Sequence, residues 1–247
     1  MHLKLIGCKV IQREIASVVY KCPNVIDVTM IRQDYHQNPD ILRSILQDEI
    51  VKIDNAVCRH TNGIRVNEIS AILLGYGLCS YATAGLKSQK YPIIIPRAHD
   101  CITLLMGSKE DYKEDYSRYV GTFFYSQGFL ELGLVSDDLR FEKLRAEYQK
   151  KYKDPKRVER LLQIEEEMLK NYKYAALIDW PELTAPFCES KVKEISKKKG
   201  WAYRQINGNN SLLEDLVNGN WSEDRFLTLP PGQEMAPSFD DEIMKIF

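Results

Sequence analysis

The chain has 247 residues, of which 44% are hydrophobic, enough to bury a full core as one large domain or as one domain with an appendage. Its 34 Lys and Arg residues nearly balance 35 Asp and Glu residues, and the net charge of -1 argues against a global basic surface for nucleic acid or anionic lipid. No apolar run approaches the roughly 18 residues of a membrane-spanning helix, and the N-terminus lacks a signal-peptide pattern. These features predict a cytoplasmic protein that binds neither nucleic acid nor membrane.

The first hundred residues alternate between β-rich runs and helical patterns. Strands are expected at residues 2–7, 25–31, 69–74 and 91–95, and Pro39 opens a helix whose apolar residues have helical spacing. This order is typical of a parallel sheet wound with right-handed crossovers. The predicted fold class is therefore α/β, with a mainly parallel Rossmann-like sheet, helices on both faces, and two or three similar α/β units.

The second half of the chain changes character. A charge-rich helical segment is interrupted at Pro155, and its i, i+4 charge pairs indicate an exposed arm of two helices. Strand and helix patterns return from Tyr174, whereas the residues after Gly232 are polar and are expected to be loosely ordered. The predicted division is an α/β portion with the central motif at 1–136, the helical arm at 137–171, a second α/β portion at 172–232 and a polar tail at 233–247.

Three cysteines, Cys8, Cys79 and Cys101, lie just past the C-terminal ends of predicted strands. Because such ends meet at one edge of a parallel sheet, we expect the three thiols to converge around a single cavity. Thiolates there would suit zinc or an iron–sulfur cluster, and three of them leave one coordination position open for a substrate. The alternative is that each cysteine is an ordinary buried residue. The remaining cysteines have no such setting and are interpreted as structural: Cys22, Cys58 and Cys188.

Polar residues beside these thiols are candidates for chemistry. His99 and Asp100 are candidate catalytic residues, because a histidine next to a thiol can lower the pKa of the thiol and a carboxylate can orient the imidazole. Asp100 can equally serve as the N-cap of a helix that opens at Cys101, whose N-terminus would itself favour a thiolate. Glu14, on the first predicted helix, is expected to face solvent.

Four residues are candidates for binding a substrate or an anion: Arg97, His36, Gly77 and Ser108. For Arg97 a structural salt bridge is the alternative. Gly77 belongs to half of a dinucleotide fingerprint that lacks its third glycine. Ser108 is also the predicted N-cap of the next helix, with Asp111 three positions on. His36 follows the second strand and is expected at the same edge of the sheet.

The segments GYGLCSYATAGLKS and IPRAHDCITLLMGS, with a strand ending at Cys8 before them and GTFFYSQGFLE after them, resemble an uncharacterised family catalogued as domain of unknown function 1638. Members of that family occur in anaerobic archaea and bacteria, often beside genes for corrinoid-dependent methylamine methyl transfer. The resemblance implies a role near one-carbon metabolism, with a corrinoid protein or a methyltransferase as a partner. It assigns no catalytic residue.

Together these observations favour a metalloprotein in which Cys8, Cys79 and Cys101 hold a metal centre, a 4Fe–4S cluster or zinc, with an open position for a small-molecule ligand. It would serve corrinoid-linked methyl transfer. One alternative is a zinc-thiolate methyltransferase, in which the metal activates a thiol substrate for alkylation. Another is a metal-free adaptor that binds a methyltransferase or a corrinoid protein. The sequence does not decide whether the protein is an enzyme.

Overall fold

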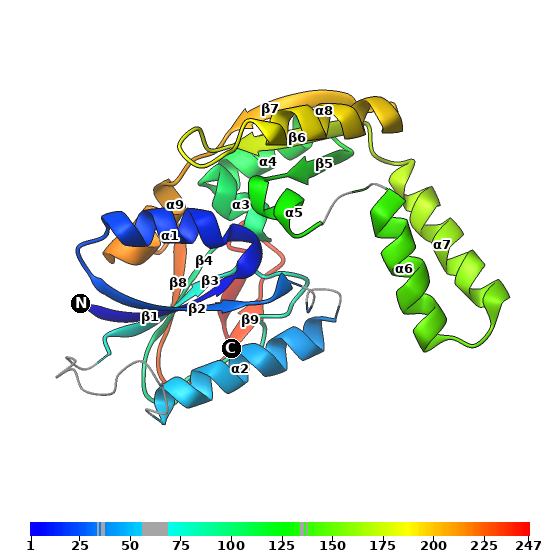
Figure 1. The fold of residues 1–247 in the computed structure, drawn as a ribbon. Coiled ribbons are helices and arrows are strands. Elements are labelled where there is room, and N and C mark those ends of the chain that lie inside the picture. Colours follow the sequence, from blue (N-terminus) through cyan, green and yellow to red (C-terminus); the bar gives the residue numbers. More distant parts are fainter. Residues whose placement is uncertain (34, 36–37, 56–68, 134–135, 137) are drawn as a thin grey trace. The chain divides into compact units, whose positions relative to one another are not determined.

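The computed structural model describes the whole chain apart from residues 34, 36–37, 56–68, 134–135 and 137. It divides the chain into two compact units (Figure 1). The first unit comprises Met1–Tyr112 and Asn209–Phe247, and the second unit comprises Lys113–Gly208. The second unit is therefore inserted into the first, and it includes the predicted arm. This division differs from the predicted boundaries at residues 136 and 172.

A five-stranded sheet forms the centre of the first unit, in the order β2-β1-β3-β4-β8. β1, β2, β3 and β4 are parallel, and only β8 runs antiparallel to its neighbour β4. The prediction of a mainly parallel sheet is thus confirmed. The strand bounds are β1 (His2–Cys8), β2 (Val25–Ile31), β3 (Ala71–Gly75), β4 (Ile93–Pro96) and β8 (Phe226–Leu229).

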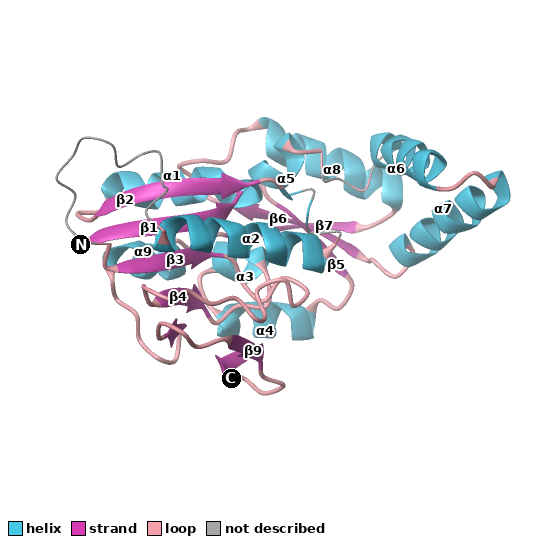
Figure 2. Cartoon of the chain, turned by 90° about the horizontal axis from the view of Figure 1, so that it is seen from below, coloured by secondary structure: helices cyan, strands magenta, loops and turns pink. Residues whose placement is uncertain are grey.

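Helices cover both faces of this sheet (Figures 1 and 2). α1 (Gln12–Lys21) and α9 (Ser211–Asn218) pack together on one face, while α2 (Pro39–Asp54) lies on the other. As predicted, α2 opens at Pro39, and the Asn38 side chain accepts a hydrogen bond from the Ile41 N–H at 3.3 Å. The double cover explains why β3 and β4 consist almost entirely of buried apolar residues.

The C-terminal residues form a small antiparallel hairpin from β9 (Met235–Pro237) and β10 (Met244–Ile246). Met235 and Met244 are buried, although the segment around them is polar. The expectation of a loosely ordered tail was therefore wrong, because a few apolar side chains suffice to fix the hairpin when an arginine also binds its carbonyls, as described below.

The second unit contains its own parallel sheet, in the order β5-β6-β7. Its strands are β5 (Thr122–Tyr125), β6 (Tyr174–Asp179) and β7 (Ala202–Asn207), and its core is completed by α8 (Phe187–Lys199) and the short α5 (Gln127–Glu131). GTFFY, at residues 121–125, is a further β-rich run, and its strand β5 belongs to this second sheet. Two separate parallel sheets fit the prediction of more than one α/β unit.

The predicted arm is a hairpin of α6 (Asp138–Lys151) and α7 (Pro155–Leu169), broken at Pro155 as expected. The Asp154 side chain caps α7 by accepting the Lys156 N–H at 3.0 Å. A small apolar cluster of Leu144, Val158 and Leu162 holds the two helices together. Among the helices in the described ranges, none is long and apolar enough to cross a membrane.

Candidate functional site

Cys8 ends β1 and leads into a short 3-10 turn, Lys9–Ile11, that precedes α1. Its side chain is buried, with 1% exposure. Burial raises the pKa of the Cys8 thiol to about 11, although the Val10 backbone and the nearby Tyr76 hydroxyl oppose the rise. Cys8 is therefore a protonated thiol at neutral pH when no cation is near it.

Cys79 lies in a strained turn after β3. Cys79, Ser80 and Tyr81 have φ angles of 47°, 56° and 67°, in the left-handed region that costs a non-glycine residue about 1–2 kcal/mol. Hydrogen bonds to distant residues help to hold this turn, from the Cys79 N–H to the His99 carbonyl at 2.8 Å and from Arg43 Nη2 to the Tyr81 carbonyl at 2.7 Å. Three consecutive strained residues beside a buried thiol indicate a functional position.

Gly77 allows the loops that follow β3 and β4 to touch. The Leu78 N–H donates to the Ala98 carbonyl at 2.8 Å, directly beside Gly77. A Cβ atom at Gly77 would lie 2.5 Å from the Ala98 carbonyl oxygen and 2.8 Å from the Asp100 nitrogen, both backbone atoms that cannot move aside cheaply. Gly77 thus brings the Cys79 loop against the Cys101 loop. Anion binding by Gly77 stays a prediction.

Cys101 is the first residue of α3 (Cys101–Met106), and Asp100 is its N-cap, as the alternative interpretation predicted. The Asp100 carboxylate accepts the N–H groups of Ile102 at 3.0 Å and Thr103 at 3.4 Å. Burial raises the pKa of Asp100 despite these bonds and the nearby His99. His99 itself is exposed, with its ring centroid 6.4 Å from that of Tyr112.

The three thiols of Cys8, Cys79 and Cys101 lie close enough to perturb one another. Burial raises the pKa of Cys79, and the charges of Cys8 and Asp100 raise it further. Burial also raises the pKa of Cys101 well above its usual range, and the same effect is reinforced by Asp100, Cys8 and Cys79. The expectation that His99 and the helix N-terminus would favour a thiolate was therefore wrong, because burial and neighbouring negative charge outweigh them.

Tyr76 completes this group, and sequence reasoning missed it. Its side chain is fully buried, and burial together with the charges of all three cysteines raises the pKa of its phenol. We refer to Cys8, Cys79, Cys101 and Tyr76 as the thiol cluster. The only sequence signal for Tyr76 was its place between two glycines just past a strand end, which is shared by many residues that have no function.

The other predicted residues have structural contacts. Arg97 Nε donates to the Glu223 carbonyl at 2.7 Å, and its Nη1 donates to the carbonyls of Glu242 and Met244 at 2.8 and 2.6 Å, which fixes the C-terminal hairpin. Ser108 caps α4 (Lys109–Arg118) by accepting the Asp111 N–H at 3.0 Å. For both residues, anion binding stays a prediction.

Two predicted residues, His36 and Cys58, lie outside the described residues. Cys22 donates its thiol hydrogen to the Val217 carbonyl at 3.2 Å, and Cys188 is buried in the core of the second unit, so both have structural settings. Glu14 was expected in solvent but is 2% exposed, at the start of the helix that follows Cys8. Sequence periodicity could not show its burial, because a glutamate on a helix normally faces water.

Within the described ranges, no group of three or more His, Cys, Asp or Glu side chains is arranged to hold a metal ion. The thiols of Cys8, Cys79 and Cys101 are unbridged by disulfides. The thiol cluster is thus a set of neutral sulfur donors around one phenol, with no counter-charge inside it.

The family described as "Protein of unknown function (DUF1638)" matches residues 30–217, about three quarters of the chain. The chain belongs to the DUF1638 family. The matched range contains Cys79 and Cys101 and the whole second unit, whereas Cys8 precedes it. No curated protein and no solved structure matches the chain. The DUF1638 description names no activity, so the proposed function is inferred from the thiol cluster.

Proposed function

We propose that this DUF1638 protein is a cytoplasmic metalloprotein in which Cys8, Cys79 and Cys101 bind a metal centre with one open coordination position. The centre would be an iron–sulfur cluster, and its role would lie in anaerobic corrinoid-linked one-carbon metabolism. The link to corrinoid chemistry and methylamine rests on the family resemblance alone.

One observation carries the proposal: thiols from three separate loops lie near enough that Cys8 raises the pKa of Cys79, and Cys8 and Cys79 both raise the pKa of Cys101. Three adjacent thiolates would repel one another, and the site contains no basic side chain that the structure shows to offset them. A soft metal ion or cluster would supply the missing positive charge and take up the three sulfurs as they lose their protons. An ordinary hydrophobic core gives no reason for three thiols and a phenol to meet at a strained turn.

The donor set fits such a centre in chemistry and in number. Three thiolates leave a position where a substrate atom can bind, and a metal there would polarise that atom as a Lewis acid. The charges of Cys8 and Cys79 act on Cys101, which supports a site shared by the three sulfurs. Zinc and an iron–sulfur cluster both accept three cysteine ligands and one further ligand, so metal analysis decides between them.

The surrounding residues have distinct parts in this proposal. The Tyr76 phenol lies near all three cysteines, and a neighbouring hydroxyl of this kind would tune the electron density on a metal-bound thiolate. Asp100 orders the start of α3 and thereby positions Cys101. His99, exposed beside Asp100, is the proposed proton donor or acceptor for a bound substrate. Thiols that must stay reduced also fit a reducing compartment, which supports the cytoplasmic assignment.

The test is purification without oxygen, followed by metal and acid-labile sulfide analysis and a visible spectrum. An iron–sulfur centre predicts iron and sulfide together with broad absorbance near 400 nm, the region expected for cysteine-ligated clusters. Stoichiometric zinc without colour would support the zinc-thiolate methyltransferase instead. Protein that binds neither metal after anaerobic reconstitution would contradict the proposal. The metal-free adaptor would then be the remaining hypothesis.

A further inference from the structure

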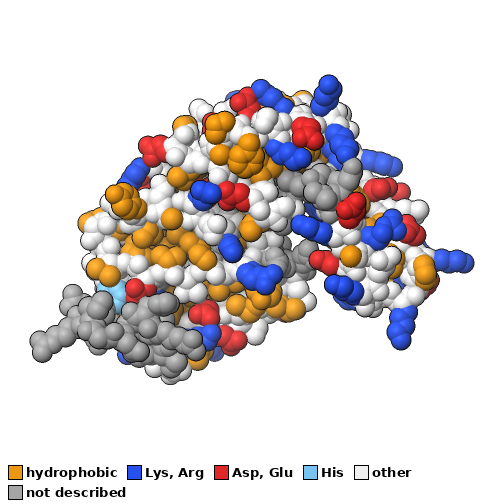
Figure 3. Space-filling view, viewed as in Figure 1, with side chains coloured by type: hydrophobic (Ala, Val, Ile, Leu, Met, Phe, Trp, Pro, Cys, Tyr) orange, Lys and Arg blue, Asp and Glu red, His pale blue; other side chains and the backbone are white. Residues whose placement is uncertain are grey.

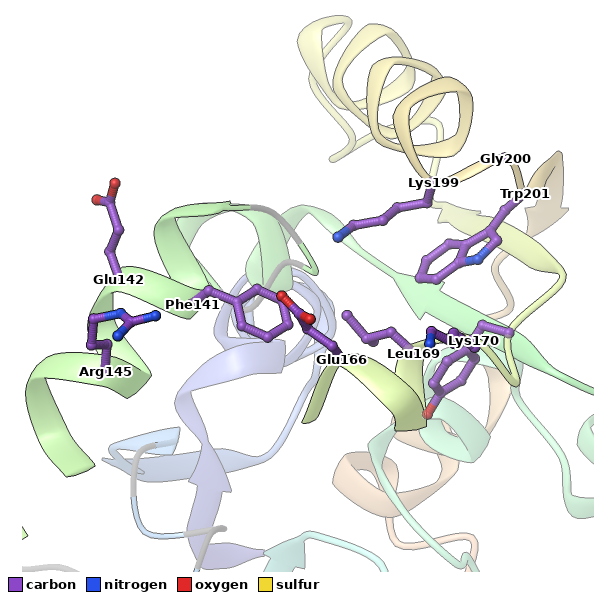
Figure 4. Close-up of a pocket in the computed structure, with 10 residues that line it drawn as sticks. Phe141, Glu142, Arg145, Glu166, Leu169, Lys170, Lys199, Gly200 and Trp201 are labelled. Atoms are coloured by element: carbon purple, nitrogen blue, oxygen red, sulfur yellow. The ribbon is translucent and has the colours of Figure 1, made fainter. Parts of the chain in front are cut away.

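A second candidate site lies entirely within the second unit, apart from the thiol cluster. A pocket of about 780 Å³ opens between the arm and the end of α8. Its size falls within the roughly 300–1,000 Å³ of small-molecule sites. Figure 4 shows Lys199 at the end of α8, and Trp201 in the α8–β7 connection, projecting toward Phe141, Glu166 and Leu169 of the arm.

Aromatic side chains line this pocket and are firmly held. The Trp201 ring stacks on Phe123, with centroids 5.9 Å apart and an interplanar angle of 20°, and it lies 5.6 Å from the ring of Tyr172. Trp201 is only 8% exposed, so it forms a fixed wall that needs no reordering when a ligand binds. Phe141 of α6 supplies a second aromatic surface in the same pocket.

Positive charge gathers at the mouth of the pocket. The last turn of α8 carries Lys197, Lys198 and Lys199, and Figure 3 shows Lys and Arg side chains at this end of α8 and along the arm. The Lys199 ammonium reaches over the Phe141 ring, 5.5 Å from its centroid. Arg145 and Lys170 also line the pocket, but Arg145 is ion-paired with Glu159. Lys199 lies beside the Phe141 ring and is therefore the cation assigned to a bound anion.

A carboxylate completes the pattern. Glu166 of α7 lines the pocket and points toward Phe141 in Figure 4. Beside aromatic walls it can accept hydrogen bonds from ring N–H or amino groups, which a purely hydrocarbon ligand lacks. The pocket thus offers three kinds of recognition at once: stacking for a flat ring, an acceptor for N–H donors, and a cation for an anionic group.

We propose that this pocket binds a nucleotide. The base would stack against Phe141 beside the wall formed by Trp201, donate to Glu166, and leave its phosphate beside Lys199. Aromatic stacking tolerates any base, so the pocket sets the class of ligand rather than the identity of the base. This proposal is independent of the metal centre, because no residue of the thiol cluster lines the pocket.

The experiment is isothermal titration of the full-length protein with AMP, adenosine and inorganic phosphate, with quenching of tryptophan fluorescence as a second readout. AMP should bind more tightly than adenosine, and phosphate alone should give no saturable binding below about 10 mM, near the affinity of an isolated ion contact. Lys199→Gln should weaken AMP binding about fivefold to tenfold and reduce its dependence on salt. The same variant should leave adenosine binding unchanged.

Lys197→Gln is the matched control, because Lys197 is an exposed lysine in the same helical turn but does not line the pocket. Glu166→Gln should weaken AMP and adenosine alike. Three results would overturn the proposal: no AMP binding up to about 10 mM, equal binding of AMP and phosphate, or equal losses in the Lys199 and Lys197 variants. Either of the last two would mean that AMP meets only a diffuse cluster of lysines.

Discussion

Replacing Gly77 with alanine tests how the two cysteine-bearing loops are held together. The added Cβ would lie 2.5 Å from the Ala98 carbonyl oxygen and 2.8 Å from the Asp100 nitrogen, so the loops must separate. Separation breaks the hydrogen bonds from the Leu78 N–H to Ala98 and from the Cys79 N–H to His99. Each bond contributes about 1 kcal/mol, and the forced shift adds about 1–3 kcal/mol. The expected loss of unfolding free energy is therefore about 3–5 kcal/mol.

Gly85→Ala is the matched control. Gly85 has a φ of 79°, but an added Cβ there meets nothing within 4 Å, so only the left-handed backbone penalty of about 1–2 kcal/mol applies. Urea unfolding followed by circular dichroism gives both free energies, and hydrogen exchange reports directly on the amides of Leu78 and Cys79. Equal costs for the two variants, or preserved protection of both amides in Gly77→Ala, would refute the reasoning.

Three further predictions concern single contacts and the arm. Asp27 contacts the buried side chains of His2 and Lys4, and their hydrogen bonds lower its pKa below 3.8 even though burial acts to raise it. The charge of Asp27 therefore stabilises the fold above the unfolded pKa, and this stability is lost as pH falls through the lower folded pKa. In urea unfolding, the free energy of unfolding of Asp27→Asn should depend less steeply on pH than that of the parent protein between about pH 5 and pH 2. An unchanged slope would count against the contact. Tyr76→Phe should leave the metal content near that of the parent protein, because the proposal places the phenol beside the ligands and not among them. Loss of the metal in this variant would make Tyr76 a ligand. Replacing residues 138–170 with a short Gly-Ser linker should leave the first unit folded, because the arm has its own apolar cluster of Leu144, Val158 and Leu162. If circular dichroism showed that all cooperative unfolding is lost, the arm would be part of the core.

Local signals allowed much of the fold to be predicted. Residues 25–31 form the predicted strand because Pro23 and Asn24 interrupt the chain immediately before it, and Pro155 breaks the arm because the residue before a proline avoids the helical region. Pattern reasoning could not tell which sheet a strand joins. β5 has the same β-rich character as the strands of the first sheet, yet it pairs with β6.

Some features of the candidate site could likewise be predicted from the sequence, and others could not. The positions of Cys8, Cys79 and Cys101 past strand ends could be read from the sequence, because parallel strands place those ends at one edge. The strained turn at Cys79–Tyr81, the buried phenol of Tyr76 and the buried carboxylate of Glu14 could not, since each depends on contacts between segments far apart in the chain. Polar side chains that become buried are the residues that hydrophobic periodicity places wrongly.

The central claim is that three specific sulfurs hold one metal centre. The most direct measurement is the metal and sulfide content of Cys8→Ser, Cys79→Ser and Cys101→Ser after identical anaerobic reconstitution. Cys22→Ser is the control, because the Cys22 thiol donates to the Val217 carbonyl and accepts the Asn24 N–H and is not part of the thiol cluster. The proposal predicts that each of the three variants loses most of the bound metal while Cys22→Ser retains it. Equal metal content in all four folded variants would contradict the proposal.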